Sequence, residues 1–444
     1  MRHPPADAEA PSSGPGGRSF GALRYRDFRL FWGGALISHV GAWMHQIAQS
    51  WLIYDLTESP FLVGLSGVFL SVPFIAMSLY AGTVVDRVDR KRALVWIESL
   101  NLVIILGISV LVATGWVQVW HLYASNVLHA LVGAFESPTR SALLPHLVPR
   151  DELMTAVSLN SVLRRGSQIV GPALGGVAIA SVGVAGTYFA YAAAHLALLW
   201  SVAMIRTTNP LEQRSHGHPL QALLQGLEYV RAESLIGTLL LMEALMSLFG
   251  GYSSMMVVFA REIFGVGPQG LGLLQSASGA GTVVGALALA ARGNVQRKGR
   301  LVVVSGVIYG LSVVAFAFCP SFLFALPILA ASGAADIVMG ATRTTIVQLL
   351  ARREMLGRTM SLHAISTRGI GPFGGSQVGA LTEIVGVQRA SAFGATVCVG
   401  VTLAVALLVP SLWGFTDADR RPTPRGRPAA SVPGERAVSM ADHP

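Results

Sequence analysis

Long apolar runs dominate this chain and constrain its fold more than any other feature. A helix needs about 20 apolar residues to cross the hydrocarbon core of a bilayer. Twelve runs of suitable length lie at residues 30–53, 61–81, 93–113, 118–138, 156–181, 184–205, 236–259, 270–291, 301–318, 321–342, 360–384 and 390–412. Charged residues make up only 12% of the chain, against about 25% in soluble domains. We therefore predict an all-α integral membrane protein with 12 transmembrane helices, which excludes most soluble enzymes and nucleic-acid-binding domains.

Positive charge falls almost entirely on one side of the predicted helices. With a cytoplasmic N-terminus, the tails and even-numbered loops hold 27 Lys and Arg, whereas the opposite side holds only Arg261 and Arg389. Cytoplasmic loops of membrane proteins are enriched in Lys and Arg, so both termini are expected in the cytoplasm. The net charge of +9 then needs no nucleic acid as a partner. We expect a multi-pass protein of the plasma (cytoplasmic) membrane, surrounded by the lipid bilayer.

An internal repeat divides the chain. A shift of 203 residues aligns Arg140 with Arg343 and Arg165 with Arg368. Charged residues carry this register, so helix n corresponds to helix n plus six, which predicts two pseudo-symmetric bundles. Chance similarity between Leu-rich and Ala-rich helices is the alternative. The predicted parts are a disordered cytoplasmic tail (1–23), an N-terminal six-helix half (24–205), a cytoplasmic linker with an amphipathic helix (206–235), a C-terminal six-helix half (236–412) and a disordered cytoplasmic tail (413–444).

A charged loop follows the second predicted helix and reads GTVVDRVDRKR. A glycine permits close helix approach, an acid can pair with a neighbouring helix end, and basic residues favour anionic headgroups. The loop resembles the G-x-x-x-D-R-x-G-R-[KR] motif of the major facilitator superfamily, with Asp89 in place of the second Gly. A charge cluster that only sets topology is the alternative. The gating candidates here are Gly82, Asp86, Arg87, Arg90 and Lys91.

The fifth predicted helix contains the sequence GSQIVGPALGG. Its small residues permit close packing, and its proline bends the backbone. The run resembles the G-x-x-x-G-P-x-x-G-G antiporter motif, which in the same superfamily is associated with exporters. Ordinary helix packing is the alternative. The candidates for a conformational role are Gly166, Gly171, Pro172, Gly175 and Gly176.

A further run, ESPTRSALLPHLVPR from Glu136 to Arg150, gives a closer resemblance. It is similar to the branch of the superfamily that includes the enterobactin exporter and macrolide-efflux permeases. This resemblance implies the major facilitator fold and proton-driven export. It leaves the substrate open, as either a siderophore-like metabolite or a drug.

Polar residues interrupt the apolar spans and predict a water-filled path between the halves. Arg165 and Arg368 lie at repeat-equivalent depths, and facing one cavity they would attract carboxylate, catecholate or phosphate groups. Bonds to helix ends or buried acids are the alternative for these arginines, as interhelical packing is for the histidines. The substrate-cavity candidates are Ser38, His45, Gln49, Asn126, His129, Arg165 and Arg368.

Acids inside the predicted spans are candidates for proton coupling, because a buried carboxylate is costly unless it is paired, hydrated or protonated. Glu243 and Asp336 are the coupling candidates. Glu136 lies four residues before Arg140, which favours a structural ion pair on one helix face.

The function predicted from these features is secondary-active export, in which one half rocks against the other. The chain has no G-x-x-x-x-G-K-[ST] sequence, so we expect no ATP hydrolysis. An importer of an organic anion is the alternative, and a polytopic membrane enzyme is a distant one because no nucleophile, base or metal constellation is visible. We expect a monomer with a small-molecule substrate, protons as the coupling ion, and neither a cofactor nor a metal.

Overall fold

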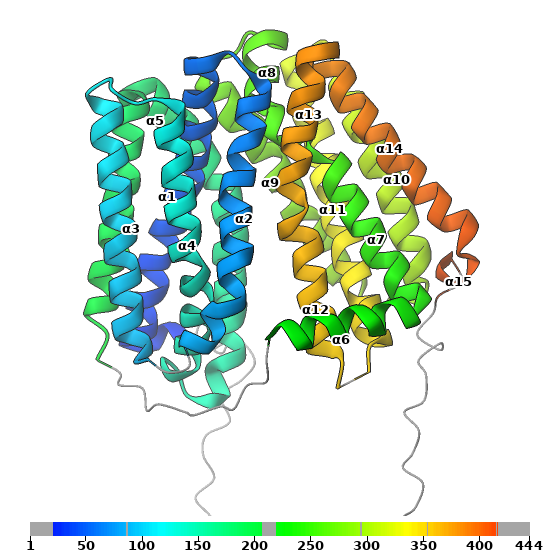
Figure 1. Cartoon of the computed structure of the whole chain (residues 1–444), viewed down its shortest axis with the longest axis horizontal. Helices are drawn as coiled ribbons and strands as arrows, with labels where there is room; N and C mark the ends of the chain where they lie inside the picture. The colour runs from blue at the N-terminus through cyan, green and yellow to red at the C-terminus, as the bar shows by residue number, and fades with distance from the viewer. Residues whose placement is uncertain are drawn as a thin grey trace, which may run out of the picture.

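The computed structural model describes residues 21–85, 88–206, 219–293, 295–352, 354–413 and 415. Within these ranges the chain forms helices and no strand. The helices gather into two bundles that lie side by side (Figure 1). The prediction of an all-α membrane protein is confirmed.

The N-terminal half contains five long helices after a short one, η1 (Gly21–Arg24). They are α1 (Arg26–Thr57), α2 (Pro60–Val85), α3 (Arg90–Ala113), α4 (Val119–Leu143) and α5 (Leu153–Ala203), with the short helices η2 (Leu144–His146) and η3 (Arg150–Glu152) before α5. The 51 residues of α5 are two spans that meet at Gly183, where φ is 75°. Glycine adopts this backbone conformation without a steric penalty, so the chain reverses there and the half has six spans.

The C-terminal half is more interrupted. Its first span joins α7 (Ser234–Phe249), η4 (Gly251–Met255), α8 (Met256–Val258) and η5 (Phe259–Ile263). Three continuous spans follow, α9 (Pro268–Arg292), α10 (Lys298–Ala317) and α11 (Phe322–Leu350). The next span joins α12 (Leu356–Ala364), η6 (Ile365–Gly369) and α13 (Gly371–Val385), and α14 (Val387–Leu408) and α15 (Pro410–Trp413) complete the half.

Among the described residues, 8 segments are long and apolar enough to cross a membrane by length and composition alone. One of them, Arg150–Ala203, holds two spans. The remaining spans, α1, α4 and the pair α12–α13, are more polar but pack within the same bundles (Figure 1). The arrangement agrees with 12 spans in the major facilitator fold.

The two halves repeat each other in register. Helix α5 begins at Leu153 and α12 begins at Leu356, which is 203 residues later. The same shift carries Gly183 to Gly386, and both have positive φ, 75° and 83°. The shift found among charged residues therefore also places the turns between spans.

Helix α6 (Pro219–Ala232) lies across one end of the C-terminal half (Figure 1). We call this end of the molecule the α6 end and the opposite one the α8 end. Gly226 of α6 packs against Arg358 of α12, where an added Cβ would lie 3.2 Å from the Arg358 side chain. The predicted linker thus contains a helix that is docked on the bundle.

The described structure extends a few residues into both predicted tails. Gly21 and Ala22 are buried in η1, although the N-terminal tail was drawn to residue 23. Phe415 is buried in the core of the C-terminal half, although the C-terminal tail was drawn from residue 413. Apolar contacts hold these residues against the bundle, and composition alone does not predict such contacts. The rest of both tails lies outside the described residues.

Candidate functional site

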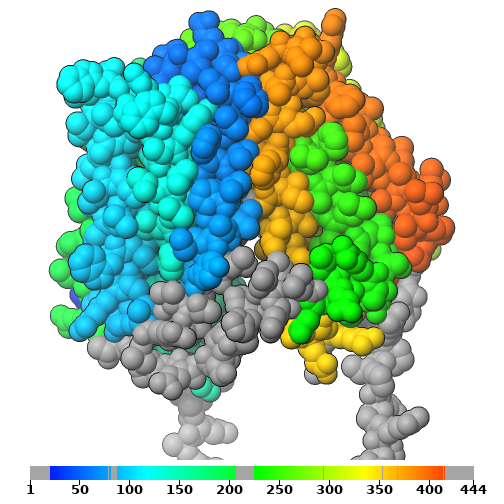
Figure 2. Space-filling model, in the orientation of Figure 1, coloured from blue at the N-terminus to red at the C-terminus, as the bar shows by residue number. Residues whose placement is uncertain are grey.

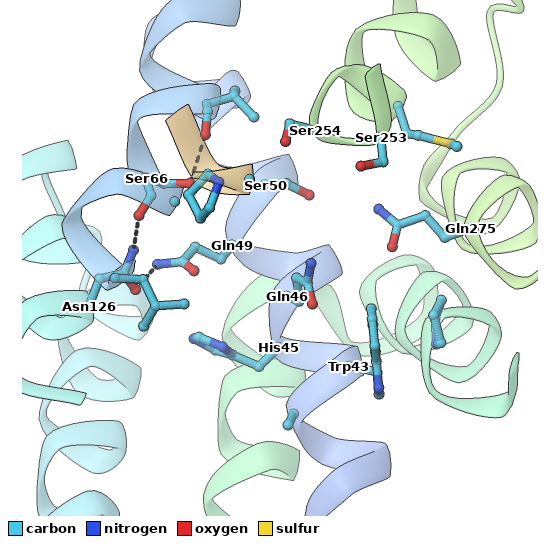
Figure 3. A pocket seen from close by; sticks show the side chains of 18 of the residues that line it. Trp43, His45, Gln46, Gln49, Ser50, Ser66, Asn126, Ser253, Ser254 and Gln275 are labelled. Atoms are coloured by element: carbon cyan, nitrogen blue, oxygen red, sulfur yellow. Dashed lines mark hydrogen bonds between the residues drawn. The ribbon is translucent and has the colours of Figure 1, made fainter. Parts of the chain in front are cut away.

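A cavity of about 720 Å³ lies between the two halves (Figure 3). Helices α1 to α5 line it from the N-terminal half, and α7, η4, α8, α9 and α13 line it from the other. Sites for drug-sized molecules have volumes of about 300–1,000 Å³. The cavity is therefore large enough for a small organic molecule.

The described lining combines polar and apolar side chains. Among the described residues that line the cavity, none is Asp, Glu, Lys or Arg. Trp43 adds an aromatic face, and Gln46 and Gln275 approach from opposite halves (Figure 3). The polar members of the lining are His45, Gln46, Gln49, Ser50, Ser66, Ser125, Asn126, His129, Gln168, Tyr191, Ser247, Ser253, Ser254, Gln275, Ser278 and Thr282. Such a surface offers hydrogen bonds from amides and hydroxyls without fixing the sign of a charge.

One hydrogen-bonded chain orders the N-terminal wall of the cavity. Gln49 Nε2 donates to Asn126 Oδ1 at 2.8 Å, and Asn126 Nδ2 donates to the carbonyl of Ser66 at 3.1 Å. These contacts join α1, α4 and α2 (Figure 3). They hold the two amides in fixed orientations toward the cavity.

Four of the predicted cavity residues line the cavity, namely His45, Gln49, Asn126 and His129. Ser38 does not, because it lies between Gly34 and Gly41 on the face of α1 that packs closely against α5. Arg165 does not either. It is exposed, with Nη1 3.5 Å from Oε1 of Gln168, which does line the cavity.

The second predicted arginine, Arg368, belongs to the π-helical turn η6, and its side chain lies outside the described residues. The predicted pair of arginines in one cavity is therefore not found among the described lining residues. Arg165 shares the helix face of Gln168 and Pro172, but it lies one turn before the part of α5 that lines the cavity.

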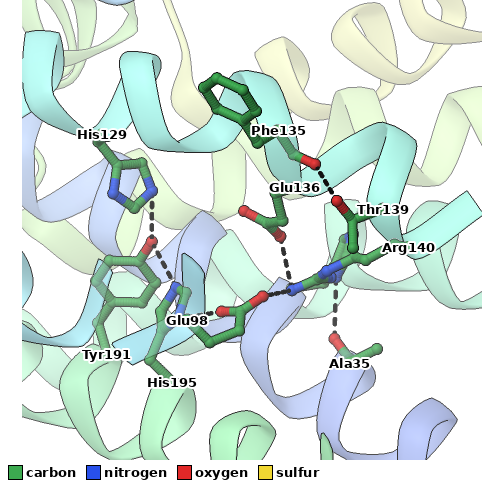
Figure 4. A network of polar contacts seen from close by, with 10 residues as sticks. Ala35, Glu98, His129, Phe135, Glu136, Thr139, Arg140, Tyr191 and His195 are labelled. Atoms are coloured by element: carbon green, nitrogen blue, oxygen red, sulfur yellow. Dashed lines mark hydrogen bonds and ion pairs between the residues drawn. The ribbon is translucent and has the colours of Figure 1, made fainter. Parts of the chain in front are cut away.

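A buried charged cluster lies beside the cavity in the N-terminal half (Figure 4). Arg140 Nη2 of α4 contacts Glu98 Oε1 of α3 at 2.8 Å and Glu136 Oε1 of its own helix at 2.6 Å. His195 Nδ1 of α5 lies 3.1 Å from the other oxygen of Glu98. The Glu98 side chain is fully buried. The structure thus brings together the predicted Glu136–Arg140 pair and adds a second acid.

Two aromatic side chains connect this cluster to the cavity. His195 Nε2 lies 3.2 Å from Tyr191 Oη, which is 3.4 Å from His129 Nε2 (Figure 4). Tyr191 and His129 both line the cavity. The Tyr191 ring also stacks on His45, with ring centroids 4.7 Å apart. A continuous series of polar contacts therefore runs from the cavity wall to Glu98.

The acids of the C-terminal half are arranged differently. Glu243 of α7 forms an ion pair with Arg343 of α11, and both side chains are buried. Asp336 lies two turns before Arg343 on α11 and is exposed. Neither coupling candidate lines the cavity.

The charged loop after α2 is described only in part, because Asp86 and Arg87 lie outside the described residues. Gly82 lies in the last turn of α2. Arg90 Nη1 lies 2.6 Å from His146 Nε2, and Lys91 donates to the carbonyl of Ile205. These two basic residues thus fasten the start of α3 to neighbouring elements of the same half.

The glycine motif of α5 permits close packing against two helices, α1 and α9. An added Cβ at Gly171 would lie 2.4 Å from the Trp43 Cβ of α1, and one at Gly175 would lie 2.9 Å from the backbone of Met44. Gly176 faces the other half, where its Cβ would lie 2.4 Å from the Pro268 carbonyl of α9. Pro172 lines the cavity, and Gly166 has open space around it.

The seam between the halves is symmetric. Gly379 of α13 stands where Gly176 stands in α5, and its added Cβ would lie 2.5 Å from the carbonyl of Pro60, the first residue of α2. Helix α2 lies against α13 in the space-filling view (Figure 2). Two matched seams, α5 on α9 and α2 on α13, therefore place backbone against backbone.

Polar contacts join the halves at the α8 end. Arg261 of η5 forms an ion pair with Asp55 of α1 at 3.1 Å, and Tyr54 donates to Glu262. Ser59 donates to Glu383 of α13. Figure 1 shows the helices of the two halves converging at this end and diverging toward the α6 end.

Sequence reasoning missed several of these groups. No role was assigned to Glu98, His195 or Tyr191 from the sequence. The spacing of four residues between Tyr191 and His195 on α5 places both on one helix face, and this was an available signal. The serines from α7, η4 and α9 carry no such signal, because single serines are common in apolar spans.

Known proteins resemble this chain over most of its length. Residues 18–427 match the family described as transmembrane secretion effector. An enterobactin exporter of Citrobacter koseri is 27% identical over 90% of this chain and 95% of its own. One from Shigella boydii is 26% identical over 86% of this chain and 92% of its own.

Solved structures resemble it in fold alone. A POT family transporter crystallised with a thioalcohol-conjugated peptide has a TM-score of 0.70 at 11% identity, covering 87% of this chain and 96% of its own. A bacterial homologue of the human lysosomal transporter Spinster, in an inward-facing and unoccupied conformation, has a TM-score of 0.65 at 13% identity. That likeness covers 88% of this chain and 96% of the homologue.

Proposed function

The chain belongs to the transmembrane secretion effector family, and from that premise we propose that it is a proton-coupled exporter of a small organic molecule. It is a multi-pass membrane transporter with the major facilitator fold, and its family and relatives are transporters rather than enzymes. The coupling ion, the direction and the substrate are the proposed parts. The observation that supports the proposed substrate class is the cavity between the two six-helix halves, whose described lining offers amide, hydroxyl and aromatic groups and no Asp, Glu, Lys or Arg.

The orientation follows from charge. We place the α6 end and both termini in the cytoplasm, because 27 Lys and Arg fall on that side by sequence. Arg261, one of the two basic residues assigned to the outside, lies at the α8 end. In this orientation the contacts of Asp55, Tyr54 and Ser59 close the outer side, so the structure is an inward-facing state.

The seams suit a rocker-switch movement between inward-facing and outward-facing states. Glycines set against carbonyl oxygens leave few interlocking side chains to disengage, so the halves can tilt against each other. The outer polar contacts would break in the outward-facing state. The same cavity would then open to the other side.

The lining favours a substrate with many hydrogen-bonding groups and an aromatic part. Amide and hydroxyl groups can bind the phenols, amides and esters of a siderophore-like metabolite or a drug, and Trp43 can stack on an aromatic ring. The related proteins named as enterobactin exporters support the first of these classes. An importer of organic anions is disfavoured, because the described lining contains no cation.

Transport into inverted membrane vesicles tests this proposal. The panel would contain enterobactin, a macrolide and a cationic dye, with and without an acidic vesicle interior. We expect uptake that requires the proton gradient, and we expect Trp43→Ala and Gln46→Ala to reduce it. Ser38→Ala is the matched control, because Ser38 is buried away from the cavity.

Two results would contradict the proposal. Uptake by right-side-out vesicles alone would indicate an importer. Equal uptake with and without a proton gradient would show that protons are not the coupling ion.

A further inference from the structure

We propose that Glu98, Glu136 and Arg140 form the proton-binding site of the transport cycle, and that His195, Tyr191 and His129 connect this site to the cavity. The inference rests on the proposed proton-coupled export and names the residues that perform it. It places proton coupling in the N-terminal half, whereas the sequence predicts the coupling residues Glu243 and Asp336 in the C-terminal half.

The first argument is charge balance. Two carboxylates share one guanidinium nitrogen, Arg140 Nη2, so the fully ionised cluster carries one excess negative charge. An uncompensated charge is costly inside a membrane protein, and a bound proton removes it. The groups that act electrostatically on Glu136 are Arg140, Glu98 and His195.

With His195 neutral, no other described charge close to the cluster removes the imbalance. From α1, the nearest titratable groups are His39, whose Nδ1 contacts the carbonyl of Ala35 at 2.9 Å, and His45, which stacks on Tyr191. From α5, the Arg164 side chain is exposed. The cluster therefore needs one proton to be neutral.

The contacts indicate where this proton resides. Glu98 is contacted through both oxygens, by Arg140 and by His195, as suits a carboxylate. Glu136 has one ionic contact, and it shares the nitrogen that already serves Glu98. We place the proton on Glu136 in the inward-facing state, with His195 neutral and donating its Nδ1–H to Glu98. Release breaks its O–H bond, gives the proton to cytoplasmic water and leaves a carboxylate beside Arg140.

The second argument is the connection to the cavity. In one tautomer of each histidine, His129 Nε2–H donates to Tyr191 Oη, Tyr191 O–H donates to His195 Nε2, and His195 Nδ1–H donates to Glu98. A proton that arrives at His129 from the cavity can then displace one proton along each bond and protonate Glu98. Arg140 then pairs with Glu136 alone. The cluster again holds one proton, now on Glu98 instead of Glu136.

A third observation marks the region as polar. Asn101 lies one turn from Glu98 on α3 and is fully buried, and neither atom of its amide has a hydrogen-bond partner among the described residues. Buried polar groups of this kind are commonly served by ordered water. Because His129 and Tyr191 also line the cavity, a substrate that occupies the cavity touches the end of the proton path. This shared contact couples substrate and proton.

Infrared difference spectroscopy on the purified, reconstituted protein tests the site without any substrate. Spectra in acidic and alkaline buffer report protonated carboxyl groups directly. We expect one titrating carboxyl in the N-terminal cluster. It should be lost in Glu98→Gln and also in Glu136→Gln, because either change leaves a neutral pair of one acid and Arg140. Asp336→Asn is the matched control and should keep it.

Persistence of this signal in both glutamine variants, or its loss in Asp336→Asn alone, would overturn the proposal. Thermal melting of each variant shows whether it is folded, and Tyr191→Phe provides a second test that keeps the ring stacked on His45. We expect Tyr191→Phe to lose the proton movement that accompanies enterobactin uptake, and unchanged proton-driven uptake would contradict the path. Absent enterobactin uptake in the wild type would count against the proposed function, whereas the infrared result would still decide the site.

Discussion

Arg140 and Arg343 occupy corresponding positions in the two halves, 203 residues apart, but their surroundings differ. Arg140 contacts two acids, Glu98 and Glu136, and one of these also contacts a histidine. Arg343 contacts one acid, Glu243, and the Met246 sulfur lies 3.9 Å from its Nη1. Asp336 acts on it from two turns away without a direct ion pair. The N-terminal arginine thus contacts two acids, whereas the C-terminal arginine contacts one.

The difference teaches that a repeated fold need not repeat its chemistry. The seams between the halves are matched almost atom for atom, with Gly176 against Pro268 and Gly379 against Pro60. In the proposed rocker-switch movement both seams tilt together, so symmetry is useful there. The proposed cycle needs a proton site only once, so one half can keep the arginine as a structural pair.

Replacing Arg140 or Arg343 should give the largest difference in stability between the two sites. Removing one partner of a buried ion pair costs about 3–5 kcal/mol, because a buried charge is left uncompensated. We expect Arg140→Gln to lower the melting temperature more than Arg343→Gln, since it strands two acids instead of one. Acidic buffer should restore part of the loss in Arg140→Gln by protonating those acids. Equal losses for the two variants across pH would break the comparison.

Replacing a whole pair by apolar residues should distinguish the sites next. For a neutral buried pair such a replacement is often harmless or stabilising by about 1–4 kcal/mol. We expect Glu243→Leu combined with Arg343→Met to melt near the wild type. Glu98→Leu combined with Arg140→Met should melt lower, because Glu136 is left without a cation. A double-mutant cycle on each pair, measured by thermal melting, checks this expectation.

Alanine substitutions in the two seams should have similar effects, unlike substitutions of the two arginines. A methyl group at Gly176 or Gly379 would meet a carbonyl oxygen at 2.4 or 2.5 Å, and such overpacking typically costs about 1–3 kcal/mol. We expect Gly176→Ala and Gly379→Ala to shift the protein toward the outward-facing state by similar amounts. Spin-label distances across the outer side measure this shift. Gly166→Ala is the control, because nothing lies near its added Cβ, and a shift in only one seam variant would contradict the symmetry.

The outer ion pair should give the smallest effect. The Arg261 and Asp55 side chains are 34% and 53% exposed, and exposed pairs contribute about 0.2–1 kcal/mol. We expect Arg261→Gln to open the outer side slightly and to do so less at high salt, where the pair is already screened. The same spin labels report the change. A large, salt-independent opening would show that this pair closes the outer side by itself.

The sequence by itself determined the spans, the repeat and the local pair of Glu136 with Arg140. Apolar run length is dictated by the bilayer, and the 203-residue shift survives in the starts of α5 and α12 because both halves fold alike. An i,i+4 pair follows from helix geometry, so no neighbour is needed to predict it.

Tertiary structure alone decided which faces meet. Glu98 and His195 lie 97 residues apart and become neighbours only when α3 packs on α5. Ser38 has the spacing of a cavity residue but is covered by α5, and Arg165 lies one turn beyond Gln168 on the same helix. Helical periodicity assigns a residue to a face, and the packing of the neighbouring helices determines whether that face meets lipid, protein or the cavity.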